Sequence, residues 1–146
     1  MMKLAPVFAA ALLVASGSDG LAKSTTLKLV EHATTDAVTD LGAKDDSAGD
    51  LLTFANQIYD EANAKQLGDD NGWCIRTVPG KAWECFWTLS LADGQITVEG
   101  PFLDAGDSVL AVTGGTGKYA GARGEMKLHA RDAKGSEYDF IYDLAQ

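Results

Sequence analysis

The sequence predicts an all-β fold, an antiparallel barrel or sandwich, on three observations. Beyond an N-terminal segment, apolar and polar side chains alternate with a period of two in seven or eight stretches. Short turns rich in Gly, Asp and Pro separate these stretches, and almost no part has the period of an amphipathic helix. The length of 146 residues is enough for one domain and too short for two.

The N-terminal segment has the layout of a secretory signal peptide. Lys3 is followed by the apolar run LAPVFAAALLVA and then by the small residues of SGSDGLAKS. A retained membrane anchor is the alternative, but it needs roughly 20 apolar residues. We therefore expect residues 1–22 to be a signal peptide, cleaved after Ala22 or Ser16. Residues 23–146 would then form a single secreted or periplasmic domain with no membrane span.

The composition argues against several classes of partner. The chain carries a net charge of −9 at pH 7, and an acidic protein is repelled by nucleic acid and by anionic membranes. Nucleic acid is therefore not an expected partner. The two cysteines and the widely separated His32 and His129 do not make a metal-ligand set, so no metal is expected.

The first predicted strand covers Thr26–His32, TLKLVEH. Its alternation places Leu27, Leu29 and Glu31 on one face. The following stretch, Ala33–Gly49, contains four aspartates and is interpreted as a solvated loop. Its spacing lacks the glycine and the terminal glutamate that a calcium-binding loop requires.

The next segment, Asp50–Ala62, is ambiguous between a helix and a strand. Its apolar residues could line one side of a helix. As a strand, the segment places Leu52, Phe54, Asn56 and Ile58 on one face. We interpret it as a strand because the segments that follow are strands.

The segments GWCIRTV and AWECFWTLSL are predicted to form a hairpin around Pro79-Gly80. If Val78 faces Lys81, the same register places Cys74 directly opposite Cys85, with Cβ atoms about 4.5–5.5 Å apart. That separation is close to bridging distance. A disulfide is the favoured interpretation for an exported protein, and two buried free thiols are the alternative. Because Pro-Gly is not a preferred hairpin turn, a bulge could shift this register by one residue.

Four more segments complete the predicted strands. GQITVEGPFL follows the turn Asp93-Gly94 and places Ile96, Val98 and Phe102 on one side. DSVLAVTG is a short apolar strand. GEMKLHARD and SEYDFIYDLA alternate apolar with polar residues toward the C-terminus.

The glycines of VLAVTGGTGKYAGARGE invite comparison with a dinucleotide-binding turn, where a strand leads through glycines into a helix. The residues after Gly117 alternate with a period of two and are too few for a helix and further strands. The spacing also has one residue too many for G-x-G-x-x-G. We therefore expect Gly114–Gly117 to permit positive φ angles and close backbone approach in a tight connection between strands.

Two longer stretches resemble the allene oxide cyclase and dirigent barrel superfamily. They are GDLLTFANQIYD…LGDDNGWC and GQITVEGPFLDAGDSVLAVTGGTGKYAGARGEMKL, so the resemblance runs from Gly49 to about Leu128. It implies an eight-stranded antiparallel β-barrel of lipocalin-like shape, with a mostly apolar lumen and assembly as a homotrimer. Plant members close an unsaturated fatty-acid epoxide into a cyclopentenone or hold two phenoxy radicals for stereospecific coupling, and neither activity needs a cofactor.

The resemblance also implies candidate site residues. The acidic residue of the family's first strand matches Glu31, the asparagine of F-x-N matches Asn56, and the cysteine of G-x-C matches Cys74. Other family positions differ: a second asparagine falls at Ala33, the tyrosine of G-P-Y is Phe102, and the Ser-Pro pair that helps to hold a catalytic water has no counterpart. These differences argue against authentic allene oxide cyclase activity.

Strand alternation indicates which side chains face the interior of such a barrel. The predicted lumen is aromatic and apolar with few polar groups, as in small-molecule sites. A Glu31 carboxyl in these surroundings is expected to have a raised pKa and could act as a general acid or base, or as an anion opposite a developing cation. We predict Glu31 and Asn56 as catalytic residues, and as substrate-binding residues Phe54, Cys74, Trp83, Trp87 and Phe102.

Each of these residues also has a purely structural explanation. Glu31 could reach water at the barrel mouth, and Asn56 could satisfy backbone groups of a neighbouring strand. Trp83 and Trp87 could simply fill the core, since an eight-stranded barrel can be filled by its own side chains. Arg76 is expected opposite Trp83, from where it could point toward Glu31.

Two functions from different classes follow. The first is a secreted, cofactor-free isomerase or cyclase, or a stereo-directing protein, that acts on a hydrophobic small molecule held in the lumen. The second is a non-catalytic barrel that binds a lipophile or has a structural role in the cell envelope.

Overall fold

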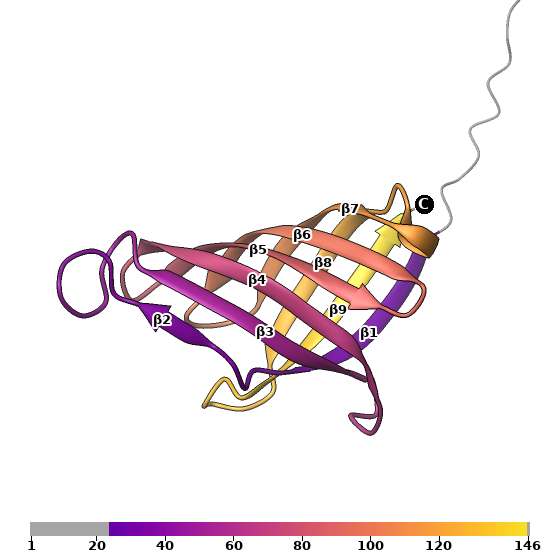
Figure 1. Cartoon of the computed structure of the whole chain (residues 1–146), viewed down its shortest axis with the longest axis horizontal. Coiled ribbons are helices and arrows are strands. Elements are labelled where there is room, and N and C mark those ends of the chain that lie inside the picture. The colour runs from indigo at the N-terminus through magenta and orange to yellow at the C-terminus, as the bar shows by residue number, and fades with distance from the viewer. Residues whose placement is uncertain (1–23, 146) are drawn as a thin grey trace, which may run out of the picture.

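The computed structural model describes residues 24–145, and these form a closed antiparallel β-barrel (Figure 1). The predicted all-β fold is therefore confirmed as a barrel. The predicted signal peptide, residues 1–22, lies outside the described residues. Within the described part of the chain, no helix has the length and apolar character to cross a bilayer.

Eight long strands form the wall of the barrel, and one short strand is added at its edge. Each strand pairs with its neighbours in the order β1-β9-β8-β7-β6-β5-β4-β3-β2, and pairing of β1 with β3 closes the barrel. The strands are β1 (Ser24–His32), β2 (Ala37–Thr39), β3 (Leu51–Asp60), β4 (Gln66–Val78), β5 (Ala82–Leu91), β6 (Gly94–Leu103), β7 (Ser108–Gly115), β8 (Arg123–Ala130) and β9 (Glu137–Ala145).

The segment Asp50–Ala62 folds as the strand β3, as predicted. One edge of β3 pairs with β1 over Gln57–Asp60 and with β2 over Leu51–Thr53. The backbone between these two pairings is interrupted on the β1–β2 side. The polar stretch that was predicted to be a loop therefore contributes a short strand, β2, whose residues are all exposed.

Alternate residues of the strands point inward and form one hydrophobic core. Aromatic side chains occupy its centre: the Trp87 and Phe140 rings stack with centroids 5.5 Å apart, and the Tyr142 ring packs edge-on against Phe140 at 6.4 Å. All three residues are at least 98% buried. Much of the barrel interior is therefore filled by its own side chains.

The hairpin of β4 and β5 has the predicted register. Cys74 lies directly opposite Cys85, and the two form a disulfide with their Cα atoms 4.0 Å apart. The register shifts by one residue beyond Arg76, so that Val78 pairs with Ala82 and a bulge adjoins the Pro-Gly turn. The predicted disulfide is present. Val78 faces Ala82 and not Lys81, but the bulge lies between Arg76 and the turn and leaves Cys74 opposite Cys85.

Arg76 lies opposite Trp83, as expected, but it does not reach Glu31. Its guanidinium pairs with Asp46 at 2.5 Å and with Asp104 at 2.6 Å, and it lies 4.2 Å from the centre of the Trp83 ring. The aspartates belong to the loops before β3 and after β6. Arg76 therefore ties these loops together over one end of the barrel.

The glycine-rich connection after β7 is tight, as predicted. It contains a single 3₁₀ turn, η1 (Gly117–Tyr119), and Gly117 has a φ angle of +58°. A Cβ atom on Gly115 would collide with the carbonyl oxygens of Gln95 and Tyr119. Close backbone approach, not nucleotide binding, accounts for the glycines.

Candidate functional site

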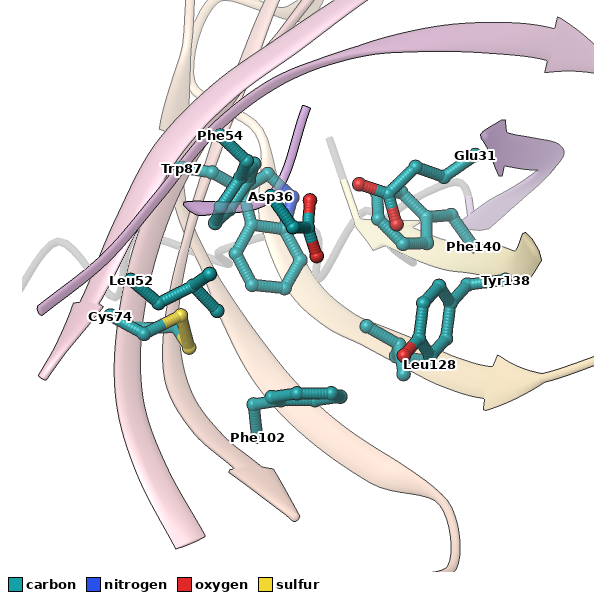
Figure 2. A pocket seen from close by; sticks show the side chains of 11 residues that line it. Glu31, Asp36, Leu52, Phe54, Cys74, Trp87, Phe102, Leu128, Tyr138 and Phe140 are labelled. Atoms are coloured by element: carbon teal, nitrogen blue, oxygen red, sulfur yellow. A yellow bond between two sulfur atoms is a disulfide. The ribbon is translucent and has the colours of Figure 1, made fainter. Parts of the chain in front are cut away.

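A pocket opens into the interior of the barrel, and its polar and apolar walls come from different strands (Figure 2). The space that can hold a water-sized guest is about 30 Å³, room for about one water molecule. A larger guest therefore needs side chains at the rim to rotate. The pocket is lined by Glu31, Asp36, Leu52, Phe54, Cys74, Cys85, Trp87, Phe102, Leu128, Tyr138 and Phe140.

Glu31 supplies a buried carboxyl group to this pocket. It lies near the end of β1, on the same face as Leu29, and is only 5% exposed. Asn56 on β3 donates a hydrogen bond from Nδ2 to Glu31 Oε1 at 2.8 Å. The alternation of β1 thus places an acid among apolar side chains, and Asn56 fixes its orientation.

Asn56 holds this position because it bridges the interruption between β1 and β2. Its Oδ1 accepts hydrogen bonds from the backbone N–H groups of Thr34 and Thr35, at 3.1 and 3.0 Å. Its Nδ2 donates to Asp36 Oδ1 at 2.7 Å as well as to Glu31. One fully buried amide therefore replaces the missing backbone pairing and joins two carboxylates. The structural explanation for Asn56, that it satisfies backbone groups of a neighbouring segment, is what these hydrogen bonds show.

Burial sets the protonation state of Glu31. Loss of hydration raises the pKa of the Glu31 carboxyl to about 7, the hydrogen bond from Asn56 opposes the shift, and the negative charge of Asp36 adds to it. The group therefore exists in both protonated and ionised forms near neutral pH. That balance suits a general acid–base catalyst.

A second buried acid, Asp70, lies beside this group and was not predicted. Asp70 is directly opposite Asn56 on β4 and is completely buried. Burial raises the pKa of Asp70 to about 9, and the adjacent Glu31 carboxyl adds to the shift. Strand alternation could have found it, because Asp70 shares the inward face of β4 with Cys74.

Aromatic rings form the walls on either side of the carboxyl groups. Phe54 packs edge-on against Trp87, with centroids 6.0 Å apart, and Trp87 stacks on Phe140. At the rim, Phe102 and Tyr138 meet edge-on at 5.9 Å. Burial raises the pKa of Tyr138 to about 12, and the nearby charges of Glu31 and Asp36 add to the shift, so Tyr138 stays protonated.

The rim pair separates the pocket from a second hollow at the same end of the barrel. This hollow lies between the β6–β7 loop and the β8–β9 hairpin, and it shares Phe102, Leu128 and Tyr138 with the pocket. Rotation of Phe102 or Tyr138 would connect the two spaces.

The structure brings most of the predicted site residues together. Glu31, Phe54, Cys74, Trp87 and Phe102 line the pocket, and Asn56 lies directly behind Glu31. Trp83 is buried on the same face of β5 but does not line the pocket, and its ring lies against the Arg76 guanidinium. Side chains that sequence reasoning did not single out complete the pocket: Asp36, Leu52, Leu128, Tyr138 and Phe140.

The donor set does not form a metal centre. Within residues 24–145, no group of three or more His, Cys, Asp or Glu side chains is arranged to hold a metal ion. The cysteines are joined as a disulfide, and the nearest amide, Asn56, is occupied by hydrogen bonds. What the arrangement can do is move a proton to or from a guest held against aromatic rings.

Comparison with known proteins places the chain among barrels of related shape. The model of the family described as allene oxide cyclase matches residues 28–132. A structure titled pyocyanin demethylase is 27% identical, with a TM-score of 0.68, and the match covers 81% of this chain and all of that one.

Two further structures show the same fold at lower identity. An exo-specific intermolecular Diels–Alderase is 15% identical, with a TM-score of 0.68, over 85% of this chain and 99% of that one. A pterocarpan synthase dirigent protein is 14% identical, with a TM-score of 0.67, over 94% of this chain and 95% of that one.

Proposed function

The chain belongs to the allene oxide cyclase family, and from this membership we propose that it is a secreted, cofactor-independent isomerase or cyclase, or a stereo-directing protein, that acts on a hydrophobic small molecule. The family and the structural neighbours support a cyclase- or dirigent-like barrel. The reaction, the guest and secretion are the parts that we propose. The disulfide supports secretion because such bonds persist in oxidising compartments.

One observation carries the proposal. The Glu31 carboxyl is buried in an aromatic pocket, oriented by a 2.8 Å hydrogen bond from Asn56, and titrates near neutral pH. A carboxyl placed only for stability would be expected at the surface or paired with a cation. No Lys or Arg among the described residues forms a salt bridge with Glu31.

We assign each group a role in proton transfer. Glu31 takes a proton from one position of the bound molecule and returns it at another, so that the guest is isomerised and no proton is consumed. Asn56 keeps the carboxyl oriented, and Phe54 and Trp87 hold the guest in place. A proton transfer of this kind needs no redox partner.

The shape of the pocket favours a flat, conjugated guest. Its walls are rings from Phe54, Trp87 and Phe140, and stacking between rings and a planar guest is stronger than contact with a flexible chain of the same area. The structure with the highest identity reported above is titled pyocyanin demethylase, which makes the flat molecule pyocyanin the first compound to test as a guest, although loss of a methyl group is not the isomerisation proposed here. An allene oxide of an unsaturated fatty acid is the second, since the family name gives that class.

The test is a comparison of native protein with the Glu31→Gln variant. Purified protein is incubated with pyocyanin or with a fatty-acid allene oxide, and products are measured by chromatography and mass spectrometry. We expect the variant to lose at least about 100-fold in turnover, because the proton carrier is gone. Equilibrium dialysis should show binding within about threefold of the native value, because the substituted side chain has the same size.

Glu84→Gln is the matched control, because it makes the same change on the exposed face of β5. It should turn over the compound at the native rate. Equal turnover by Glu31→Gln and native protein would remove Glu31 from the mechanism. Tight binding without any conversion would instead support the second function, a barrel that binds a lipophile without catalysis.

Assembly as a homotrimer is a further part of the proposal, and it comes from the family resemblance. Exposed apolar side chains on the outer face of β4 are consistent with contact between subunits: Trp73 is 43% and Ile75 is 41% exposed. Native mass spectrometry of the exported protein would give the number of subunits and the mass of any bound molecule.

A further inference from the structure

We propose that Asp70 and Glu31 form a carboxyl pair in which Asp70 keeps a proton and shares it with Glu31. Glu31 is the group that meets the guest, and Asp70 is a positioning residue that acts through it. The inference rests on the proposed function where it gives Glu31 the transferred proton. The pairing itself is a property of the free protein and can be tested without a substrate.

Strand register brings the two carboxyl groups to one place. Asp70 on β4 is the direct cross-strand partner of Asn56 on β3, and Asn56 is hydrogen-bonded to Glu31 on β1. Side chains of directly opposed residues lie on the same face with Cβ atoms about 4.5–5.5 Å apart. Three neighbouring strands therefore direct an acid, an amide and a second acid into the same part of the lumen.

Asp70 has no means of carrying a charge in this environment. It is completely buried, and no cation or hydrogen-bond donor among the described residues pairs with its carboxyl oxygens. The one buried guanidinium in the described part of the chain, that of Arg76, is committed to Asp46 and Asp104. An unpaired buried carboxylate costs several kcal/mol, so the group remains protonated.

The groups that face Asp70 leave Glu31 as its acid–base partner. Tyr142 on β9 is completely buried within range of the Asp70 and Glu31 charges, and burial raises the pKa of its hydroxyl well above the usual range, so it does not ionise. Trp87 and Leu89 from β5 and Asn56 from β3 do not titrate. Asp36 and Tyr138 act on Glu31 from the rim side.

A protonated Asp70 would serve Glu31 in a specific way. A protonated carboxyl is a hydrogen-bond donor, and donation to the Glu31 carboxylate stabilises the ionised form. Against the effect of burial, the hydrogen bond from Asn56 and, to a smaller extent, the Asp70 carboxyl both lower the pKa of Glu31. During the proposed isomerisation Glu31 gains a proton from the guest and returns it, while the Asp70 O–H bond stays intact. Protons therefore balance, and no oxidant or reductant is involved.

The experiment is a carboxyl titration by NMR with ¹³C-labelled Asp and Glu side chains in the full-length protein without ligand. In native protein, the Asp70 signal should remain protonated at pH 7 and titrate above the Glu31 signal. In Glu31→Gln, the pKa of Asp70 should fall by about one unit or more, because the neighbouring negative charge has been removed.

Reciprocal variants test the direction of the effect on Glu31. Asp70→Leu removes the donor, so the pKa of Glu31 should rise by about one unit. Asp70→Asn keeps a donor of the same size, so the pKa of Glu31 should stay within about half a unit of the native value. Asp69→Asn, on the exposed neighbour in β4, should change neither signal.

An Asp70 signal that is ionised at pH 7, or that does not move in Glu31→Gln, would overturn the pair. If Asp70→Leu does not fold, the Glu31→Gln and Asp70→Asn titrations still decide the question. A confirmed pair combined with unchanged turnover in Glu31→Gln would leave the pair standing and reject the proposed function. Loss of turnover in Glu31→Gln, combined with Asp70 and Glu31 signals that titrate independently of each other, would support the proposed function and reject the pair.

Discussion

At the scale of single residues, Asn56 links the segment after β1 to both carboxyl groups of the site. Its side chain makes five hydrogen bonds, three to Thr34 and Thr35 and two to the carboxylates of Glu31 and Asp36. A buried amide can use every donor and acceptor it has only where the backbone leaves groups unpaired. The interruption between β1 and β2 provides those groups, so the strand break and the placement of Glu31 have one cause.

The buried acids predict an unusual dependence of stability on pH. Both Glu31 and Asp70 have pKa values raised above those of the unfolded chain, so the folded protein binds more protons than the unfolded one. Below about pH 4 both carboxyls are protonated in the folded and in the unfolded protein, so neither reduces the free energy of unfolding. The free energy of unfolding should therefore fall as the pH rises from about 5 to 9, by several kcal/mol, because one pKa unit corresponds to about 1.4 kcal/mol.

The double variant Glu31→Gln/Asp70→Asn tests this expectation. Urea denaturation should give a much smaller loss of stability between pH 5 and pH 9 than in native protein. The control pair Glu84→Gln/Asp69→Asn changes the same charges on the exposed surface and should keep the native slope. A slope that is equal in all three proteins would show that the buried carboxyls do not resist ionisation.

At the scale of elements, strand alternation and turn chemistry predicted most of the fold. The register of β4 and β5 followed from one turn and placed Cys74 opposite Cys85, as the structure shows. Asp70 was within reach of the same argument, since it shares a face with Cys74. It was missed because the polar stretch LGDDNG was not assigned to a strand. A sequence of that composition favours a turn unless neighbouring strands pair with it on both sides.

Other features of the site depend on contacts between distant segments. Asp36 lies in a stretch with the composition of a loop, and only the hydrogen bond to Asn56 brings it to the pocket. Arg76 was expected to point toward Glu31, but its guanidinium pairs instead with Asp46 and Asp104, which belong to two loops at the same end of the barrel as the pocket. Pairing of charges across loops has no local pattern in a sequence, so alternation could not predict either case.

The disulfide gives a prediction for the β4–β5 hairpin. Cys74–Cys85 closes a short loop in the unfolded chain, and a bond of this kind contributes about 2–3 kcal/mol. Thermal unfolding followed by circular dichroism should therefore show a lower midpoint in the presence of a reductant. The Cys74→Ala/Cys85→Ala variant should unfold at the same temperature with and without it. An unchanged midpoint in native protein, with both thiols shown to be free, would mean that the bond does not stabilise the fold.

At the scale of the whole molecule, the barrel is closed and its centre is filled. The rings of Trp87, Phe140 and Tyr142 occupy the middle, so the available space lies toward one end. The family resemblance correctly implied the eight-stranded barrel. It could not give the width of the lumen, because that depends on how each aromatic side chain is rotated and not on strand order.

Phe102→Ala tests whether the rim controls entry. Removal of the ring would connect the pocket with the neighbouring hollow. A guest that enters would then no longer have to break the edge-on contact between Phe102 and Tyr138. Such contacts are worth about 0.5–1.5 kcal/mol, so binding of the neutral dye N-phenyl-1-naphthylamine should strengthen by about 2- to 10-fold. Fluorescence titration measures the affinity.

The control for this variant is Phe86→Ala, which removes the same ring from the outer face of β5, where it packs against Trp73. It should leave dye affinity unchanged. Equal affinities for native protein and both variants would show that the dye does not pass the rim, and circular dichroism would confirm that each variant is folded.

The cross-linked hairpin also has a consequence for stereochemistry. The disulfide joins β4 and β5 covalently, and Figure 2 shows Cys74 on one side of the pocket with Glu31 and Tyr138 on the other. A flat molecule whose orientation is fixed by the aromatic walls would meet the Glu31 carboxyl from one side only. Protonation from that direction alone would yield one enantiomer.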